Sequence, residues 1–428
     1  MNYELKAYEI KNHFLQVGEG LMGISAVLYE PVNPDERAHT AAMCMHSDSN
    51  YLAFTPCPEL AARGFTVMAA NTTEPKQPLE KKLLELKKCV EYLKNMDGIE
   101  RVVLLGHSGG ATLMSCYQAV AENGCGIFQD EEKIVKMPDI GELPAADAVM
   151  FLDSNWGNGV MTLLSIDPQV TDETSTQNFD TSYDLFDPAN GFDPAGSHYS
   201  PEFRARYQKA QAARFDRIID SALERKALID KGEGRFIGDE PFIVPAGAQP
   251  APNNRMFPQD ISLLCRTKNE YPLLHADGSV TTEVIRSLRP PKFTRSMSRM
   301  YGMATDVSTV NTYLSGSSVR TKDFSYDECE VKGIQWNSSY CCTPGNVQHI
   351  AAPMLIMGMT GGYEFLAAEV ICENAKKTTD KTVMFVEGAT HNFTPEHATE
   401  KTPGEYGDTV YNCFNYVAQW LCEKVVEE

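Results

Sequence analysis

The sequence predicts an α/β fold, with a doubly wound and mainly parallel sheet that is interrupted by a large insertion. Short β-rich runs alternate with helical patterns over residues 1–154, and this alternation resumes over residues 351–428. Strands that alternate with helices require crossover connections, which place successive strands parallel to one another. Residues 155–350 are irregular, as in the stretches LFDPANGFDPAGSHYSPEF, VPAGAQPAPNN and SLRPPKF. We therefore expect 1–154 and 351–428 to form one core and 155–350 to form a mostly helical or irregular cap.

The expected core strands are short apolar runs. They are Gly23–Tyr29, Ala41–Met45, Phe65–Ala70, Val102–Leu105, Ala148–Leu152, Pro353–Met357 and Thr382–Val386. Apolar residues three or four positions apart predict a helix over Pro78–Met96, and a similar pattern predicts a closing helix over Tyr406–Val425. Within the insertion, Ser200 is a favourable N-cap for a long helix that starts at Pro201 and ends at Gly232.

Composition and charge exclude several classes of protein. The chain has 428 residues, of which 43% are hydrophobic, and 38 Lys and Arg against 58 Asp and Glu give a net charge of −20. This apolar content suits a domain-sized core rather than a disordered chain, and the acidic field repels nucleic acid. Apolar stretches such as Ala148–Leu152 are far shorter than the roughly 20 residues of a membrane span. Because no secretory pattern and no CxxC pair is seen, we expect a reduced, cytoplasmic protein.

Two features of the insertion bear on a ligand. Aromatic side chains are frequent in it, and we expect most of them to form its core and some to line a pocket for a ring-containing or acyl substrate. They are Trp156, Phe179, Tyr183, Phe186, Phe192, Tyr199, Tyr301, Tyr313, Trp336 and Tyr340. A basic patch comprises Arg286, Arg289, Lys292, Arg295, Arg299, Arg320 and Lys322. Such a patch either steers an anionic substrate or pairs with acidic neighbours or a second subunit.

The strongest local signal is the segment GHSGG at residues 106–110. Strand residues Val102–Leu105 run directly into it, and the pattern from Ala111 onward is helical. A serine on so tight a turn needs neighbours without side chains, which explains the glycines around Ser108. The Ser108 hydroxyl is expected at a helix N-terminus, where backbone N–H groups stabilise developing negative charge.

This strand, Gly-x-Ser-x-Gly turn and helix resemble the nucleophile elbow of the α/β-hydrolase superfamily. The resemblance extends upstream, where TAAMCMHSDSNYLAFTPCPELAARGFTVMAAN is similar to the family's third strand, oxyanion loop, first helix and fourth strand. It implies that Ser108 is the nucleophile. It also implies an oxyanion hole formed by the backbone N–H of Gly109 and by that of Asp48 or its neighbour, with His46-Ser47-Asp48 in the place of the usual His-Gly-x.

Downstream, KTVMFVEGATHNF resembles the family's last strand and catalytic-histidine loop, which implies that His391 is the general base. A serine hydroxyl is a poor nucleophile at neutral pH, so an imidazole must accept its proton and later return it to the leaving group. The order of Ser108 before His391 matches the family. His107 is expected to point away from the pocket, as in a typical elbow, and His397 lies well past the end of the strand.

Three carboxylates compete for the acid of the triad. In the family an Asp or Glu usually follows the strand equivalent to Pro353–Met357, where this chain has GMTGGYEFLAAEVICENA. We predict Glu369, in the first turn of an expected helix over Phe365–Ala375, because its longer side chain helps it to reach the imidazole. Glu364 in the same stretch is one alternative. Asp153, after an earlier strand, is the other, because some members of the fold supply the acid there.

These residues predict a serine hydrolase that cleaves an ester, thioester or lactone of a small substrate, aromatic substrates included, through an acyl-enzyme at Ser108. The alternatives are a C–C bond hydrolase or amidase with the same triad, and a non-catalytic binding protein on the same fold. The mechanism requires no metal and no organic cofactor, and no Gly-rich dinucleotide or phosphate loop is seen. The expected partner is a small-molecule substrate, without nucleic acid or membrane. A large cap and a lone basic patch favour a homodimer.

Overall fold

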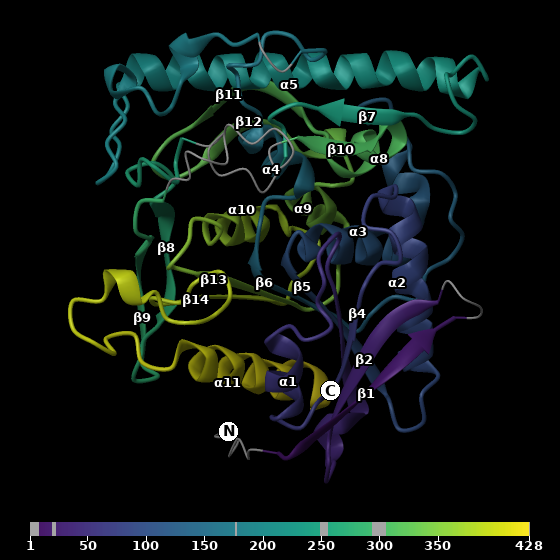
Figure 1. Cartoon of the computed structure of the whole chain (residues 1–428). Helices are drawn as coiled ribbons and strands as arrows, with labels where there is room; N and C mark the ends of the chain where they lie inside the picture. The colour runs from purple at the N-terminus through teal and green to yellow at the C-terminus, as the bar shows by residue number, and fades with distance from the viewer. Residues whose placement is uncertain (1–7, 19–22, 176–177, 249–255, 293–304, 428) are drawn as a thin grey trace.

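A ten-stranded sheet crosses the centre of the molecule (Figure 1). The computed structural model describes residues 8–18, 23–175, 178–248, 256–292 and 305–427. The strands of the sheet are β1 (Ile10–Val17), β2 (Ile24–Pro31), β3 (Thr40–Met45), β4 (Thr66–Ala70), β5 (Arg101–Ser108), β6 (Ala148–Ser154), β8 (Arg266–Leu274), β9 (Val280–Arg286), β13 (Met354–Met359) and β14 (Lys381–Val386).

Neighbouring strands follow the order β1-β2-β4-β3-β5-β6-β13-β14-β8-β9. The strands from β4 to β8 pair in parallel, whereas β1, β2 and β9 pair antiparallel at the two edges. The predicted mainly parallel sheet is therefore confirmed, and each strand expected from the sequence is present. Strand β1 was not expected, because most of its side chains are exposed and it lacks an apolar run.

Helices cover both faces of this sheet. The helices α2 (Leu79–Lys94), α3 (Gly110–Asn123) and α10 (Leu366–Asn374) pack on one face, and α1 (Pro56–Ala61) and α11 (Thr409–Leu421) pack on the other. Alternate residues of each strand point to opposite faces of the sheet and belong to two separate hydrophobic cores. Met43 and Leu104 lie in the core on the side of α2 and α3, and Cys44 and Leu105 lie in the core on the side of α1 and α11. Both predicted core helices are confirmed. Among the described residues, none of the helices combines the length and the apolar composition needed to cross a lipid bilayer.

Most of the insertion lies beyond the face of the sheet that α2, α3 and α10 cover (Figure 1). It contains α4 (Asn158–Ser165), α5 (Pro201–Asp230), β7 (Pro241–Val244), β10 (Asp306–Thr309), α8 (Val310–Gly316), β11 (Arg320–Tyr326), β12 (Val331–Gln335) and α9 (Thr343–Asn346). Helix α5 runs across the top of the molecule in Figure 1. The Ser200 side chain caps this helix by accepting a hydrogen bond from the backbone N–H of Phe203, as the sequence predicted.

The predicted boundaries of the insertion do not follow the sheet. Strands β8 and β9 belong to the segment 155–350, yet β8 pairs in parallel with β14 through Leu273 and Leu274 and extends the core. The segment therefore contains an edge hairpin of the sheet as well as the layer above it. The hairpin reads RTKNEYPLL and VTTEVIR, with several exposed charges. Such strands lack the apolar runs of a buried parallel sheet, which is why the sequence did not indicate them.

Several aromatic and basic residues of the insertion are buried or form hydrogen bonds and ion pairs within the protein. Trp156, Tyr199, Tyr313 and Tyr340 are buried in the core, and Tyr301 lies outside the described residues. Two members of the predicted basic patch are held by the protein itself. The Arg289 guanidinium donates to the backbone carbonyls of Phe257, Leu263 and Leu264, and Arg320 pairs with Asp216 and Asp220 on α5. The pairing of Arg320 agrees with the alternative that the patch pairs with acidic neighbours, and Arg295 and Arg299 lie outside the described residues.

Candidate active site

Ser108 stands on a strained turn between β5 and α3. Its backbone has a φ of 53°, in the left-handed region that side-chain-bearing residues rarely adopt. A Cβ on Gly106 would lie 2.7 Å from the Cα of Ala111, and a Cβ on Gly110 would lie 2.9 Å from the carbonyl oxygen of Met45. Both positions therefore require glycine, and the elbow predicted from the motif is present.

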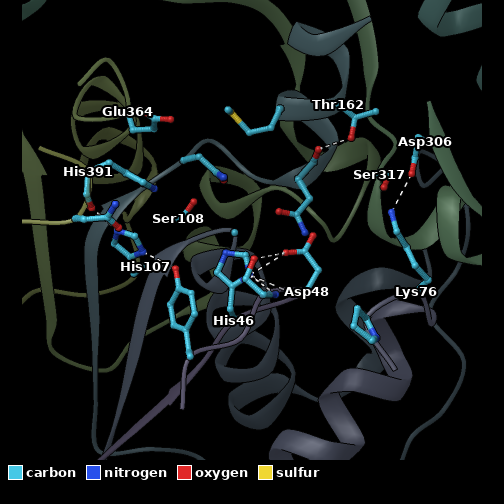
Figure 2. Close-up of a pocket in the computed structure, with 18 residues that line it drawn as sticks. His46, Asp48, Lys76, His107, Ser108, Thr162, Asp306, Ser317, Glu364 and His391 are labelled. Carbon is cyan, nitrogen blue, oxygen red and sulfur yellow. Dashed lines mark hydrogen bonds and ion pairs between the residues drawn. The ribbon is translucent and has the colours of Figure 1, made fainter. Parts of the chain in front are cut away.

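The turn presents Ser108 to a cavity of about 570 Å³ (Figure 2). His391 and Glu364 line the same cavity, and most of the other lining side chains are polar. The Ser108 hydroxyl forms no hydrogen bond with a described residue. None of the aromatic residues that the structure describes in the insertion lines this cavity, contrary to the expectation that some of them do.

His391 lies in the loop after β14 and is bonded to Asp153. The imidazole Nδ1 is 2.6 Å from Asp153 Oδ2, and the Asp153 side chain is fully buried. Asp153 itself has a φ of 45° at the end of β6, and its Oδ1 accepts a hydrogen bond from the backbone N–H of Met359 at 2.8 Å. The neighbouring strand thus holds the carboxylate behind the imidazole, which leaves His391 Nε2 as the nitrogen free to exchange a proton.

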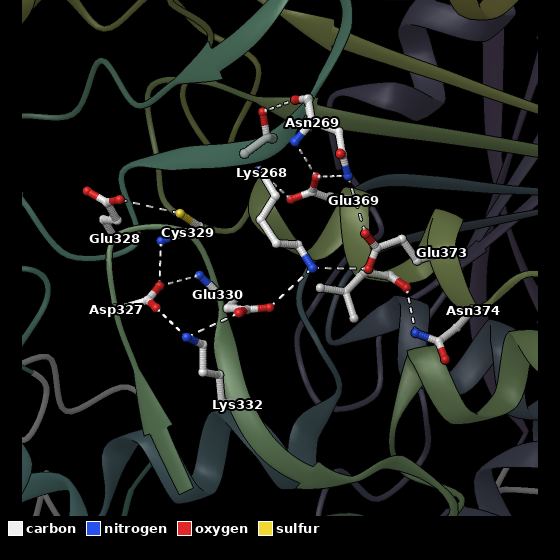
Figure 3. Close-up of polar contacts among 12 residues, drawn as sticks. Lys268, Asn269, Asp327, Glu328, Cys329, Glu330, Lys332, Glu369, Glu373 and Asn374 are labelled. Carbon is white, nitrogen blue, oxygen red and sulfur yellow. Dashed lines mark hydrogen bonds and ion pairs between the residues drawn. The ribbon is translucent and has the colours of Figure 1, made fainter.

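Glu369, the predicted acid, does not meet His391. Its carboxylate accepts hydrogen bonds from the backbone N–H groups of Lys268 and Asn269, both at 3.0 Å, and from the Asn269 side chain at 3.1 Å (Figure 3). Glu369 therefore ties α10 to β8, and the prediction that it orients the histidine is wrong. Because β8 was not expected from the sequence, the backbone groups that bind this carboxylate could not be foreseen.

Glu364 lies close to the pair without replacing Asp153. One carboxylate oxygen each from Asp153 and Glu364 and one imidazole nitrogen of His391 lie within 4.8 Å of one another. Such a group has the chemistry of a metal site. However, a hydrogen bond already joins His391 to Asp153, and Asp153 also accepts the Met359 N–H, so the arrangement suits proton transfer better than metal ligation.

His107 supports the histidine loop from below. Its Nε2 donates to the backbone carbonyl of His391 at 2.7 Å, so its Nδ1 accepts the hydrogen bond from the Tyr51 hydroxyl at 2.6 Å. Burial, followed by the charge of His391, holds the pKa of His107 well below its usual range, and the ring is neutral. His107 lines the cavity, so the expectation that it points away from the pocket is wrong. Both of its ring nitrogens are nevertheless occupied by Tyr51 and by the carbonyl of His391. His397 pairs with Glu400 and is exposed.

Of the two backbone N–H groups expected to form the oxyanion hole, only that of Gly109 is without a hydrogen-bond acceptor among the described residues. The backbone N–H of Gly109, at the start of α3, bonds to no described residue and lines the cavity. The backbone N–H of Asp48 instead donates to His46 Nδ1 at 3.1 Å. The expectation that Asp48 offers its amide to the cavity is therefore not met, because the polar His-Ser-Asp sequence lets the loop bond to itself.

The charges around His391 favour its protonated form. Burial lowers the pKa of His391, but the Asp153 hydrogen bond and the negative charges of Glu364 and Asp153 raise it, and the balance is a pKa of about 9. Burial raises the pKa of Asp153 to about 6, against the opposing effect of His391. At neutral pH the two side chains therefore form an ion pair, with Asp153 ionised and His391 protonated.

Because Glu369 joins α10 to β8, substituting it should lower the stability of the protein and leave the geometry around Ser108 unchanged. Glu369→Ala leaves two backbone N–H groups unpaired and lowers the free energy of unfolding by about 2 kcal/mol, as urea denaturation would measure. Glu373→Ala, one turn further along α10, removes a partly exposed ion pair with Lys268 and a 3.5 Å hydrogen bond from the Asn269 side chain, and costs about 0.5 kcal/mol. Equal losses in the two variants would contradict this role.

Comparisons with known proteins give similarity in structure alone. No protein-family model matches the sequence, and no curated protein matches it. Est1E from Butyrivibrio proteoclasticus is similar at 11% identity, with 96% of this chain and 98% of that chain covered and a TM-score of 0.39. Proline iminopeptidase from Mycobacterium smegmatis has 13% identity, the same coverage and a TM-score of 0.39. Esterase B from Lactobacillus rhamnosis has 9% identity, 99% and 92% coverage and a TM-score of 0.38.

Because these similarities are low, the fold is assigned from the features of the chain itself. The central strands are parallel, Ser108 stands on a glycine-flanked turn between a strand and a helix, and His391 follows the last parallel strand that the sequence predicted. These features identify the chain as a protein of the α/β-hydrolase fold.

Proposed function

We propose that this protein is a serine hydrolase that cleaves an ester bond of a small, polar substrate through an acyl-enzyme at Ser108. The observation that carries the proposal is the hydrogen bond between His391 and the buried carboxylate of Asp153, beside a serine that faces the same cavity. A nucleophile, a base and a group that orients the base are the three parts that acyl transfer by serine requires.

The reaction begins when His391 Nε2 accepts the proton of the Ser108 hydroxyl. The serine oxygen attacks the ester carbonyl, and the backbone N–H of Gly109 stabilises the negative charge that develops on the carbonyl oxygen. The imidazolium then gives its proton to the departing alcohol, which leaves an acyl-enzyme. A water molecule, activated by the same imidazole, releases the acid and restores Ser108.

Asp153 and His107 act through His391. Asp153 fixes the tautomer of the imidazole and stabilises the imidazolium, while His107 holds the backbone of its loop. We also propose that the layer containing α5 covers the cavity as a cap and excludes bulk water from the acyl-enzyme. A thioester, lactone, amide or C–C bond requires the same residues, so product analysis with a panel of such compounds defines the bond.

The first test is covalent labelling of the nucleophile. A fluorophosphonate should attach to the wild-type protein at Ser108, as peptide mass spectrometry would show, because the elbow presents the hydroxyl to the cavity that His391 also lines. Ser108→Ala should abolish both labelling and ester turnover. The conservative control is Ser115→Ala, a buried serine on α3 that should leave labelling intact. Full turnover by Ser108→Ala would exclude the proposed mechanism.

The second test compares the effects of Asp153 and Glu369 on kcat. Asp153→Asn should lower kcat by about 10³-fold, because the amide neither fixes the productive tautomer of His391 nor balances its charge. Glu369→Gln should keep kcat within about threefold in protein that remains folded, since Glu369 contacts β8 and not the imidazole. A kcat that falls more in Glu369→Gln than in Asp153→Asn would restore Glu369 as the acid.

The third test is the pH dependence of kcat/KM. Only the neutral imidazole is a base, so kcat/KM should rise with pH up to the pKa of His391 near 9. Glu364→Gln removes a negative charge that favours the imidazolium and should move this rise to lower pH. Asp153 and His107 remain beside the ring in both proteins. Turnover of a methyl ester in a pH-stat measures both profiles, and an unchanged midpoint in Glu364→Gln would contradict the charge assignment.

A further inference from the structure

Glu364 is a carboxylate that the proposed reaction does not use. It lies in the loop between β13 and α10, lines the cavity of Ser108 and stands within 4.8 Å of His391 and Asp153 (Figure 2). We propose that Glu364 binds a cationic amine on the alcohol part of the substrate ester. This inference rests on the proposed function and narrows its substrate class to esters of amino alcohols.

The Glu364 carboxylate forms no hydrogen bond and no close ion pair in the described part of the chain, although the His391 imidazole lies within 4.8 Å of it. No described donor forms a hydrogen bond with it, and no described Lys or Arg lies within ion-pair distance. A carboxylate that lines a cavity without a hydrogen bond is available to a ligand, whereas a carboxylate with a structural role, such as Glu369, has its oxygens occupied.

The neighbouring cations are bound elsewhere. Lys76, which lines the same cavity, is 2.9 Å from Asp306. Lys292 lies 3.7 Å from Glu396, and the Arg289 guanidinium donates to backbone carbonyls. None of these side chains forms an ion pair with Glu364, and the charge of Arg289 acts on it only from a greater distance.

The charge balance favours a cation over a neutral group. With His391 protonated, the charges of Asp153, His391 and Glu364 sum to −1, and they sum to −2 when the imidazole is neutral. An ammonium group beside Glu364 offsets this excess. An anionic group would instead meet Glu364 at short range in a partly enclosed cavity, where charge repulsion is only weakly screened.

The position of Glu364 beside His391 indicates which part of the substrate it meets. His391 delivers a proton to the oxygen of the leaving alcohol, so groups next to the imidazole flank the alcohol rather than the distal part of the acyl chain. A second cavity of about 200 Å³ lies on the other side of Glu364 and contains Arg289 and Lys292. A cationic amine is therefore expected on the Ser108 side.

The test uses two acetate esters of nearly equal shape. In 2-(dimethylamino)ethyl acetate the alcohol carries a protonated amine at pH 7, and in 3-methylbutyl acetate a carbon replaces the nitrogen. The wild-type protein should show at least a tenfold higher kcat/KM for the cationic ester, and Glu364→Gln should reduce this preference to threefold or less. The ratio within each protein cancels any effect of Glu364→Gln on His391 that both esters share.

A matched control separates a direct contact from the general field of the cavity. Asp306→Asn removes the same charge from the same cavity but at the Lys76 ion pair, and it should keep most of the preference. A wild-type preference below threefold, an unchanged ratio in Glu364→Gln, or an equal loss in Asp306→Asn would overturn the assignment of Glu364.

Failure of this inference can be told apart from failure of the proposed function. If Ser108 reacts with a fluorophosphonate and 3-methylbutyl acetate is cleaved without a preference for the amine, the hydrolase remains and only the role of Glu364 is lost. Protection of Ser108 from labelling by 2-(dimethylamino)ethanol, but not by 3-methylbutanol, gives a binding readout that is independent of turnover. If Ser108 neither reacts nor supports turnover, both proposals fall together.

Discussion

The hydrogen bond between Asp153 and His391 joins residues that are 238 positions apart, and the candidate site depends on it. The bond is possible because β13 lies between β6 and β14 in the sheet, so that the ends of three parallel strands meet at one edge. Asp153 is anchored by the backbone of β13 through Met359 and holds the imidazole that follows β14. The order of the strands therefore brings Asp153 and His391 together.

Three carboxylates compete for this histidine in the sequence, and their surroundings give them three different roles. Glu369 is buried and its oxygens are occupied by the backbone of β8, so it stabilises the sheet edge. Asp153 is buried against the imidazole and balances its charge. Glu364 reaches the cavity with no described hydrogen bond, which is the property of a group that meets a ligand. Side-chain type alone does not distinguish these roles, because each depends on which donors lie nearby.

The surroundings of the site also depend on residues that do no chemistry. His107 precedes the serine in the elbow and bonds to the carbonyl of His391, so the turn that presents the nucleophile also supports the loop of the base. The cavity is lined mainly by polar groups, while large aromatic residues of the insertion are packed into its core. The polar lining is consistent with the proposal that the substrate is hydrophilic and charged.

The sequence by itself determined the elbow at Ser108, the parallel core strands and the long helix α5, because each depends on neighbours along the chain: glycines beside a serine, apolar runs and a capped helix start. It did not reveal β8 and β9, whose polar strands carry no apolar signal, and it assigned the wrong acid. Only the tertiary structure decided between Glu369 and Asp153, since that choice depends on strand neighbours far apart in sequence. Asp153 has a left-handed backbone conformation, and the backbone N–H of Met359 on β13 holds its carboxylate against the imidazole. The residues next to Asp153 in the sequence do not indicate this contact.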